Sequence, residues 1–490
     1  MSKRGLGCVA VVLSVLIPGV SGAQVSGSSG TQSTGAQGAG NQRVDAPDAS
    51  EGLGLRMGNL ELHPSIAGEI GYDSNYFLRS SKTADPGQPP ISNGGPVGSG
   101  VLQITPTLTL NTLGEKRKAV LTDTDAQPSA PPAIGFRGGI TAKYREFLNP
   151  DMSDQRNVGG AVDARIDVLP QRPWSGSLGG SFIRTILPTF TGNPDLAFNR
   201  LDLALGGDIV WNPGGGTLEW KVGYDLRLAM FEQSVAQPYT NMTNEVYMLG
   251  RWKFRPRTSL VYDGSVRWTH YSDVSGAAAS LHDSTPVRAR FGMTGLITPR
   301  FAVKALVGYG ASFYDASVDA HTQQFDSVIG EIEARFFLSP AAATEDITSS
   351  GSTLSIGGNR DFANSFLGDF VTTDRAYVKL SQSFGRRVSV SADAGVAAME
   401  YPDIYYQAKA VGKTGAPQLV QNSFTDIRPD VSIAGEYRFT STFAITATGS
   451  FSQNISNATL PGTPTATGVK TIYDLSWQRI TGFAGLRWFM

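Results

Sequence analysis

A histidine and a serine two residues apart, His270 and Ser272, form the spacing in this sequence that most resembles catalytic machinery. Residues i and i+2 of a strand project from one face, so the imidazole could serve as the base for the hydroxyl. A third polar residue would have to orient the imidazole, and the sequence identifies none. The dipeptide His282-Asp283 is too short a motif to indicate a protease. We therefore expect no catalytic role, and a surface hydrolase using His270 and Ser272 is kept only as an unfavoured alternative.

The residue types that bind metals give no site. The four histidines, His63, His270, His282 and His321, lack the paired spacing of a metal site. The only cysteine, Cys8, lies in an N-terminal apolar segment that is expected to be removed. The mature chain therefore has no disulfide and no thiol nucleophile, and we expect no metal and no cofactor.

Charged residues are the second set that could have a function, as the lining of a channel. They alternate with apolar residues along many runs of the sequence. If the apolar faces of these runs contact lipid, the charged faces line a lumen. The signs interleave on neighbouring runs, which favours ion pairs that brace the wall over a charge ladder that orients solutes. The lumen-lining candidates are Arg200, Lys221, Arg227, Arg251, Lys253, Arg267, Arg288, Arg290, Asp202, Asp225, Asp263, Glu331 and Glu333.

Five of these candidates, on three consecutive runs, form a locally basic group: Arg251, Lys253, Arg267, Arg288 and Arg290. This group is the preferred contact zone for anionic solutes or saccharides. The competing and favoured interpretation is that nearby acids neutralise it, namely Glu245, Asp263, Glu331 and Glu333.

The elements that position these residues are predicted to be strands. In the run 217–230, Leu218, Trp220 and Val222 begin one apolar face, while Glu219 and Lys221 begin the opposite polar face. Seven apolar residues at a period of two indicate a strand, since a helix would distribute the charges around its surface. The segment 212–216, Asn-Pro-Gly-Gly-Gly, joins this run to the one before it as a hairpin turn.

About 18 such runs (16–20 within error) follow one another, and the connections between them alternate between short and long. Bacterial outer-membrane barrels have short periplasmic turns and long outer loops, and an even strand count places both termini in the periplasm. The connections 113–133 and 339–352 break this alternation, and either could plug the lumen. The runs begin near residues 58, 101, 134, 157, 173, 199, 217, 243, 258, 286, 301, 326, 353, 375, 387, 424, 442 and 475.

Composition supports this fold class. Glycine makes up 57 of the 490 residues, about 12%, and charged residues make up 17%. Typical soluble proteins have about 7% glycine and about 25% charged residues. The near balance of 42 acidic and 41 basic residues excludes a generally basic nucleic-acid binder. Residues 1–23 resemble a signal peptide and 24–55 a disordered periplasmic linker, which leaves 56–490 for the barrel. Aromatic residues near run ends predict an interfacial girdle of Trp211, Trp220, Trp252, Trp268 and Trp488.

The first run, Leu60 to Phe77, resembles the opening of an outer-membrane β-barrel porin family of proteobacteria. The match rests on Pro64 and on the run Gly71-Tyr72-Asp73 followed by Asn75 and Phe77. The resemblance implies an all-β, transmembrane, antiparallel up-and-down barrel in the outer membrane, in contact with lipid and lipopolysaccharide. Some members of this family accompany exopolysaccharide-secretion proteins.

The favoured function is a porin-like, water-filled channel for passive passage of small polar solutes. The alternative is an outer-membrane component of exopolysaccharide export, and the surface hydrolase ranks last. The chain ends on Trp488-Phe489-Met490 instead of a final Phe or Trp, which we interpret as a variant signal for the barrel-assembly machinery. No nucleic-acid partner is expected, and the oligomeric state stays open.

Overall fold

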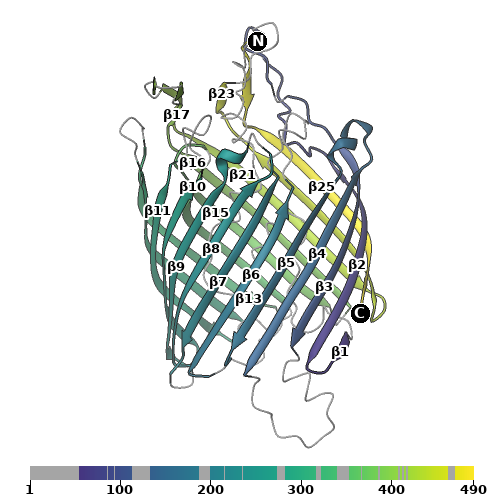
Figure 1. Cartoon of the computed structure of the whole chain (residues 1–490), viewed down its shortest axis with the longest axis vertical. Coiled ribbons are helices and arrows are strands. Elements are labelled where there is room, and N and C mark those ends of the chain that lie inside the picture. Colours follow the sequence, from purple (N-terminus) through teal and green to yellow (C-terminus); the bar gives the residue numbers. More distant parts are fainter. Residues whose placement is uncertain are drawn as a thin grey trace, which may run out of the picture.

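In a computed structural model, the chain folds as a barrel of tilted strands (Figure 1). The structure describes residues 54–490 except 85, 93, 113–132, 171, 187–198, 214–215, 234–235, 273–281, 316–321, 339–351, 366, 385–386, 407–408, 411–412, 415–417 and 462–469. The predicted signal peptide, nearly all of the predicted linker, and both candidate plugs (113–133 and 339–352, apart from their last residues) lie outside the described residues.

Eighteen long strands, each paired antiparallel with its neighbours, close into one barrel. The first and last of them, β2 and β25, pair from Ser65 with Phe489 to Asp73 with Thr481. The prediction of an antiparallel barrel of about 18 strands is therefore confirmed. The wall strands are β2 (Leu60–Asp73), β3 (Ser99–Thr112), β4 (Ile134–Phe147), β5 (Asn157–Val168), β6 (Trp174–Thr185), β7 (Arg200–Trp211), β8 (Leu218–Phe231), β9 (Asn241–Arg255), β10 (Thr258–Tyr271), β11 (Ser284–Thr298), β12 (Phe301–Tyr314), β13 (Phe325–Phe337), β14 (Ser352–Asn364), β15 (Phe370–Phe384), β16 (Val388–Tyr401), β21 (Phe424–Arg438), β22 (Phe443–Asn454) and β25 (Trp477–Phe489).

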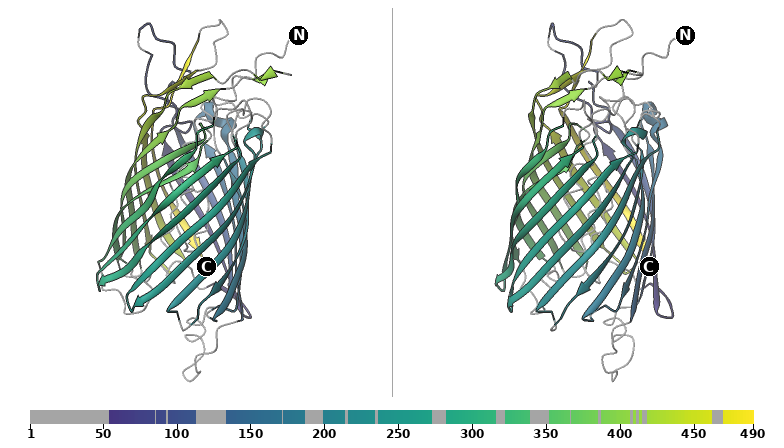
Figure 2. Two further views of the ribbon diagram at one scale, coloured as in Figure 1. Left: turned by 90° about the vertical axis from the view of Figure 1, so that its left-hand side faces the viewer. Right: turned by 60° about the vertical axis from the view of Figure 1, so that its left-hand side comes forward.

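The two ends of the barrel differ. At one end, here called the turn end, short connections such as Pro256-Arg257 between β9 and β10 join the strands. At the opposite end, the loop end, long connections carry the small strands seen at the top of Figure 1. These strands are β17 (Ile404–Tyr406), β18 (Lys409–Ala410), β19 (Lys413–Thr414), β20 (Gln418–Gln421), β23 (Thr459–Pro461) and β24 (Ile472–Asp474). Two views from other sides show the same tilt around the whole wall (Figure 2).

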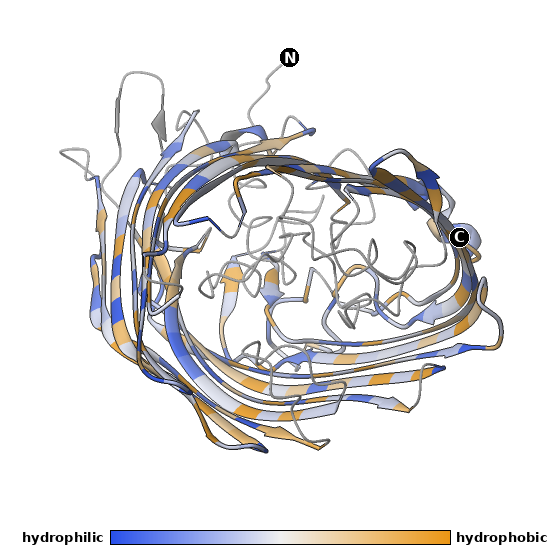
Figure 3. Ribbon diagram, turned by 90° about the horizontal axis from the view of Figure 1, so that it is seen from below, coloured by the Kyte–Doolittle hydropathy of each residue, from blue (hydrophilic) through white to orange (hydrophobic). Residues whose placement is uncertain are grey.

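Apolar side chains cover the outside of this single-layered wall. Seen along the barrel, hydrophobic and hydrophilic residues alternate on the strands of a closed ring (Figure 3). Val307, Ile332 and Leu486, for example, are each about 60% exposed, at 64%, 61% and 59%. Successive strand residues point to opposite faces, so the charged residues between these apolar ones face inward. Among the described residues, no helix is long and apolar enough to cross a membrane.

A short nineteenth strand, β1 (Leu55–Met57), lies at the seam of the barrel. It pairs with the turn-end part of β2, from Leu55 opposite Leu62 to Met57 opposite Leu60. The closing strand β25 pairs with β2 only from Ser65 onward. Strands β1 and β25 thus share one edge of β2, and the Met490 amide, which donates to the Pro64 carbonyl, lies between them.

Candidate functional site

The inner faces of β5 to β9 carry a chain of ion pairs. The Asp208 carboxylate on β7 lies 3.2 Å from Lys221 on β8 and 3.8 Å from Arg165 on β5. Further toward the loop end, Arg227 on β8 lies 3.7 Å from Glu245 on β9 and 3.7 Å from Asp225 on its own strand. These contacts join neighbouring strands across the wall, as the interleaved signs predict.

Three arginines of β10 and β11 are buried on the inner face. Arg267 donates to Glu245 at 2.9 Å, and Arg290 donates to Asp263. Arg288 donates through Nε to Asp361 at 3.0 Å, although Asp361 belongs to β14, three strands away. Each guanidinium is at most 7% exposed and has a carboxylate partner, as a buried charge requires.

The structure divides the basic group that the sequence places together. In the β9–β10 register Arg251 is opposite Val261 near the turn end, whereas Arg267 is opposite Glu245. Arg251 pairs with Glu219 at 2.7 Å, and Lys253 shares the turn-end part of its strand. Two acids expected to neutralise the group pair elsewhere: Glu331 with Lys304 at 2.9 Å and Glu333 with Arg335 at 2.7 Å. Asp361, which is not among the candidates predicted from the sequence, neutralises Arg288 instead.

The last two candidates, Arg200 and Asp202, lie on the same face of β7 near the loop end. Their side chains form a 2.8 Å hydrogen bond along the strand. Thr185 on β6 donates to the same Asp202 carboxylate at 3.4 Å. This pair therefore reinforces the rim of the wall.

The loop-end part of the β14–β15 hairpin separates from β13 and folds into the barrel. Strand β13 pairs with β14 only between Gly330–Phe337 and Thr353–Arg360. The pairing of β14 with β15 continues beyond this point, as far as Asn364 opposite Phe370. Residues 361–373, here called the inner hairpin, are therefore a paired unit that is no longer joined to β13. On the other side, its last two residues, Thr372 and Thr373, still pair with Glu400 and Met399 of β16.

Side-chain contacts place the inner hairpin against the inside of β11, β12 and β13. The Phe362 ring stacks on Phe325 of β13 with centroids 4.0 Å apart. The same ring packs over Gly310 of β12, where any Cβ would collide with it. Arg288 of β11 lies 4.2 Å from the ring centroid and also donates to the Phe362 carbonyl. The wall is double-layered here, which explains why Phe362 and Asp361 are 2% and 1% exposed.

Polar contacts hold the tip of the inner hairpin as well. Asn364 Nδ2 donates to Ser284 Oγ of β11 at 2.6 Å. Asp369 accepts from the backbone amide of Gln323 at 2.6 Å, and its other oxygen lies 2.7 Å from His282 Nδ1. The hairpin is thus anchored along its length to the wall on one side of the barrel.

An apolar cluster at the loop end, here called the mouth cluster, joins the inner hairpin to distant parts of the wall. Leu367 and Val371 of the hairpin belong to it, with Tyr239 and Tyr271 from the β8–β10 side. From the other side come residues of β16 and of the β22–β25 connection. The buried members are Phe231, Ala236, Tyr239, Tyr271, Leu367, Val371, Ala397, Met399, Tyr401, Ile404, Ala458, Leu460, Tyr473 and Leu475.

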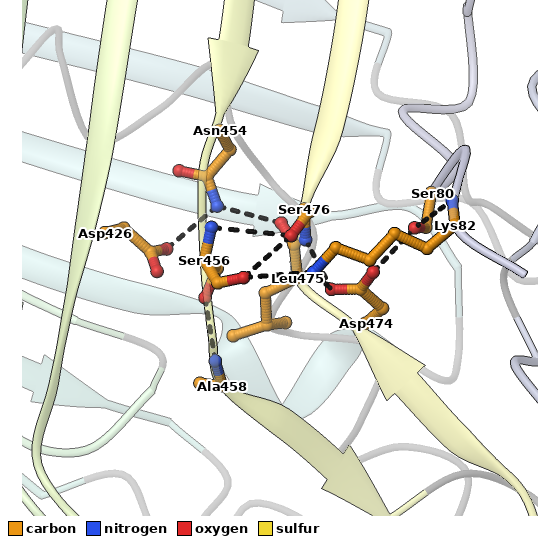
Figure 4. Close-up of polar contacts among 9 residues, drawn as sticks. All are labelled: Ser80, Lys82, Asp426, Asn454, Ser456, Ala458, Asp474, Leu475 and Ser476. Atoms are coloured by element: carbon orange, nitrogen blue, oxygen red, sulfur yellow. Dashed lines mark hydrogen bonds and ion pairs between the residues drawn. The ribbon is translucent and has the colours of Figure 1, made fainter. Parts of the chain in front are cut away.

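A polar network, drawn in Figure 4, ties the β2–β3 connection to the β22–β25 connection beside the mouth cluster. Ser80 donates to one oxygen of Asp474 at 2.7 Å, and Lys82 lies 3.3 Å from the other. Asn454 Nδ2 donates to Asp426 and to the Leu475 carbonyl, both at 2.8 Å. These contacts join the two loops to each other beside the mouth cluster.

Titratable groups outside the strands have shifted pKa values at this end, among them Glu232 and Tyr76. Arg184 donates two hydrogen bonds to the Glu232 carboxylate, at 2.6 and 2.8 Å, and thereby lowers the pKa of Glu232. Tyr76, which is 2% exposed, packs against Phe147 with ring centroids 4.6 Å apart. Burial raises the pKa of its hydroxyl, so Tyr76 acts as a neutral packing residue.

The residue that would orient the histidine of a hydrolase is present, but the serine does not contact the histidine. His270 Nδ1 is bonded to the Asp283 carboxylate, which also accepts from the Tyr271 amide at 2.9 Å. Ser272 Oγ donates to the Thr240 carbonyl at 3.2 Å instead of to the imidazole. The nucleophile–base hydrogen bond that activates a serine is therefore not formed.

The tryptophans predicted as a girdle gather mostly at the turn end. Trp211 is opposite Trp220 and stacks with Trp174 at 6.0 Å, while Trp252 is 51% exposed. Trp488 is opposite Phe443, also at this end. Only Trp268, at 46% exposure, lies toward the loop end among the five candidates.

No group of three or more His, Cys, Asp or Glu side chains in the described part of the chain has metal-binding geometry. Comparison with known proteins gives no match to a family model and no match among curated sequences.

Solved structures with similar architecture include outer-membrane proteins of Pseudomonas. OpdK of Pseudomonas aeruginosa has a TM-score of 0.40 and 10% identity over 88% of this chain and 99% of its own. A BenF-like porin of Pseudomonas fluorescens Pf-5 has a TM-score of 0.40 and 9% identity over 89% and 100%. OccK2 (OpdF) of Pseudomonas aeruginosa, solved with glucuronate, has a TM-score of 0.41 and 9% identity over 87% and 97%. At these values the architecture of the chain rests on its own strand pairing.

Proposed function

We propose that this chain is an outer-membrane, porin-like channel for small polar solutes, narrowed at its loop end by the inner hairpin and the mouth cluster. The observation that carries the proposal is a closed wall of 18 strands with apolar residues outside and charged residues inside. A barrel of this size leaves an aqueous lumen unless something fills it. The lumen-lining candidates predicted from the sequence, Arg200 and Glu333 among them, line that lumen, and most of them form ion pairs that brace the wall.

The orientation follows from the same geometry. The described N-terminal strand β1 and the C-terminal Met490 both lie at the turn end. Short turns face the periplasm in outer-membrane barrels, so we infer that both termini are periplasmic and that the mouth cluster faces outward. A signal peptide at 1–23, a linker at 24–55 and insertion by the barrel-assembly machinery complete this proposal.

The inner hairpin argues against polymer transit. An exopolysaccharide needs a wide, continuous polar path, whereas buried apolar side chains such as Leu367 and Val371 connect opposite sides of the mouth. Nothing in the described residues favours export over diffusion. The hydrolase alternative also loses support, because the Ser272 hydroxyl is bonded to Thr240.

Single-channel conductance of the refolded mature chain in a planar bilayer tests the proposal. We expect small, ohmic steps that oligosaccharides do not block. A matched variant replaces residues 361–373 with Asn-Gly, which can join Arg360 and Asp374 because these two are register partners. Its steps should be larger. If the wild type and the variant both fold correctly and neither of them conducts, the channel proposal is wrong. Blockade of the wild type by oligosaccharides would favour saccharide transport.

A further inference from the structure

Strand β4 carries a row of cations on its inner face. Register pairing of β4 with β3 places Arg145 opposite Gln103 and Arg137 opposite Asn111. Lys143 lies between them and is opposite Gly159 of β5. Arg137, Lys143 and Arg145 share one parity along the strand, so all three point into the lumen.

Unlike the ion-paired arginines described above on β5 to β11, these three cations have no carboxylate partner in the part of the chain that the structure describes. Among the described residues, no Asp or Glu lies within ion-pair distance of Arg137, Lys143 or Arg145. The printed polar contact of Arg145 is a 3.3 Å hydrogen bond to the amide oxygen of Gln103. The acids that act on these cations from a longer range are Asp73 and Glu69 of β2 and Asp163 of β5. Of these, Glu69 already accepts a 2.6 Å hydrogen bond from Gln103. The positive charge on this strand is therefore only partly compensated.

The surroundings of Lys143 leave room and neutral hydrogen-bonding groups. Gly159 has no side chain, and a Cβ built there would meet only backbone oxygens, at 3.4 and 4.0 Å. Thr105, on the neighbouring β3, has a buried hydroxyl oxygen that makes no hydrogen bond with the described residues. Thr141 and Thr107 lie beyond it, with hydroxyls 3.4 Å apart.

We propose that Lys143 and Arg145 form a contact site for a small anionic group, a carboxylate or a phosphate, that passes through the lumen. This inference rests on the proposed channel function and adds a substrate class to it. Residues two apart on a strand are about 7 Å apart along it, so an anion between the two cations contacts both and removes their mutual repulsion. The guanidinium offers paired donors and the ammonium a compact charge, which together suit a carboxylate or phosphate oxygen pair.

The test uses the refolded full-length mature barrel and two probes, inorganic phosphate and acetate, added to a chloride electrolyte. We expect each probe that binds to reduce the single-channel chloride current in a saturable way. K143Q/R145Q should raise the half-blocking concentration about tenfold or more, since each hydrogen bond to a charged group contributes at least about a factor of ten. The control K304Q/R335Q removes the same charge from cations that are ion-paired, and should keep the block.

The outcomes separate the site from the channel. Unchanged block in K143Q/R145Q, an equal loss of block in K304Q/R335Q, or no block of the wild type by either probe would overturn the site. A folded wild type and a folded variant with residues 361–373 replaced, neither of which conducts, would overturn the channel instead. Equilibrium dialysis of phosphate and acetate against the barrel in detergent would then decide the site alone, since only the wild type and K304Q/R335Q should retain the anion. The probe that binds more tightly identifies the preferred anion chemistry.

Discussion

Replacing Asp361 with alanine should release the inner hairpin from the wall. Arg288 and Asp361 are 3% and 1% exposed, and their 3.0 Å hydrogen bond joins β11 to β14. Removing one member of a buried ion pair leaves the other charge without compensation, at a cost of about 3–5 kcal/mol. Arg288 keeps its bond to the Phe362 carbonyl and its contact with the ring, so the lower part of this range applies.

That cost falls mainly on the seated hairpin, because Arg288 regains water once the hairpin leaves. Since about 1.4 kcal/mol is a factor of ten, Asp361→Ala should raise the ratio of released to seated hairpin by roughly 100-fold or more. The double variant R288M/D361L removes both charges and keeps apolar volume, which is often neutral for a buried pair. It should restore the seated state.

Two assays report the hairpin. Single-channel conductance should rise, or become flickering, in Asp361→Ala and return to the wild-type level in R288M/D361L. The second assay is thiol labelling of Ser312→Cys, because Ser312 of β12 is 0% exposed and the expected mature chain has no other cysteine. Labelling should accelerate in the Asp361→Ala background only. A folded Asp361→Ala barrel with wild-type conductance and a protected Cys at position 312 would refute the reasoning.

Three further predictions concern the wall, the rim and the exterior. Arg267→Ala should lower the temperature at which the folded barrel unfolds on a heat-modifiability gel. Glu245, whose side chain is 5% exposed, then keeps Arg227 at 3.7 Å as its one ion-pair partner among the described residues. E245Q/R267M should unfold closer to the wild type, and an unchanged unfolding temperature of Arg267→Ala would contradict the bracing role. Because Arg184 lowers the pKa of Glu232, its stabilisation is present above the ordinary value of 4.5 and is lost as the pH falls through the lowered folded pKa. The difference in stability between wild type and Glu232→Gln should therefore be largest near neutral pH and vanish in acid; a difference that grows in acid would show the opposite linkage. Lipids brominated near the headgroup should quench the fluorescence of Trp211 and Trp252 more than lipids brominated at the chain end, and the reverse order would place these residues outside an interfacial girdle.

The strands could be predicted because each one obeys the same simple alternation. The predicted beginnings near 134, 157, 258, 301 and 424 coincide with β4, β5, β10, β12 and β21. The largest departure is the run expected from 375, because strand β15 begins at Phe370. Val371 and Thr372 are neighbours that are both buried, so this part of β15 does not show the alternation of a strand with one exposed face. Residues of the inner hairpin are buried on both faces, so apolar and polar residues no longer alternate with a period of two.

The parts of the site that were missed depend on partners far away in the chain. Asp361 meets Arg288 across 73 positions, and nothing near Asp361 in the sequence signals an inward fold. The lack of carboxylates beside Lys143 and Arg145 emerges only when the strand register is known. Likewise, Asp283 reaches His270 from a connection whose path the sequence does not determine.

The short strand β1 has a consequence for how the barrel closes. The edge of β2 stays unpaired until β25 has been synthesised, because β25 follows all other wall strands in the chain. An unpaired edge can pair in several registers that differ by two residues. Strand β1 already occupies the edge from Leu60 to Leu62, so β25 cannot slide further in that direction than Met490 beside Pro64. The register of the last strand sets the shear of a closed barrel, and shear together with strand number sets its diameter. Three residues at the N-terminal edge thus act as a stop that limits how the ring closes.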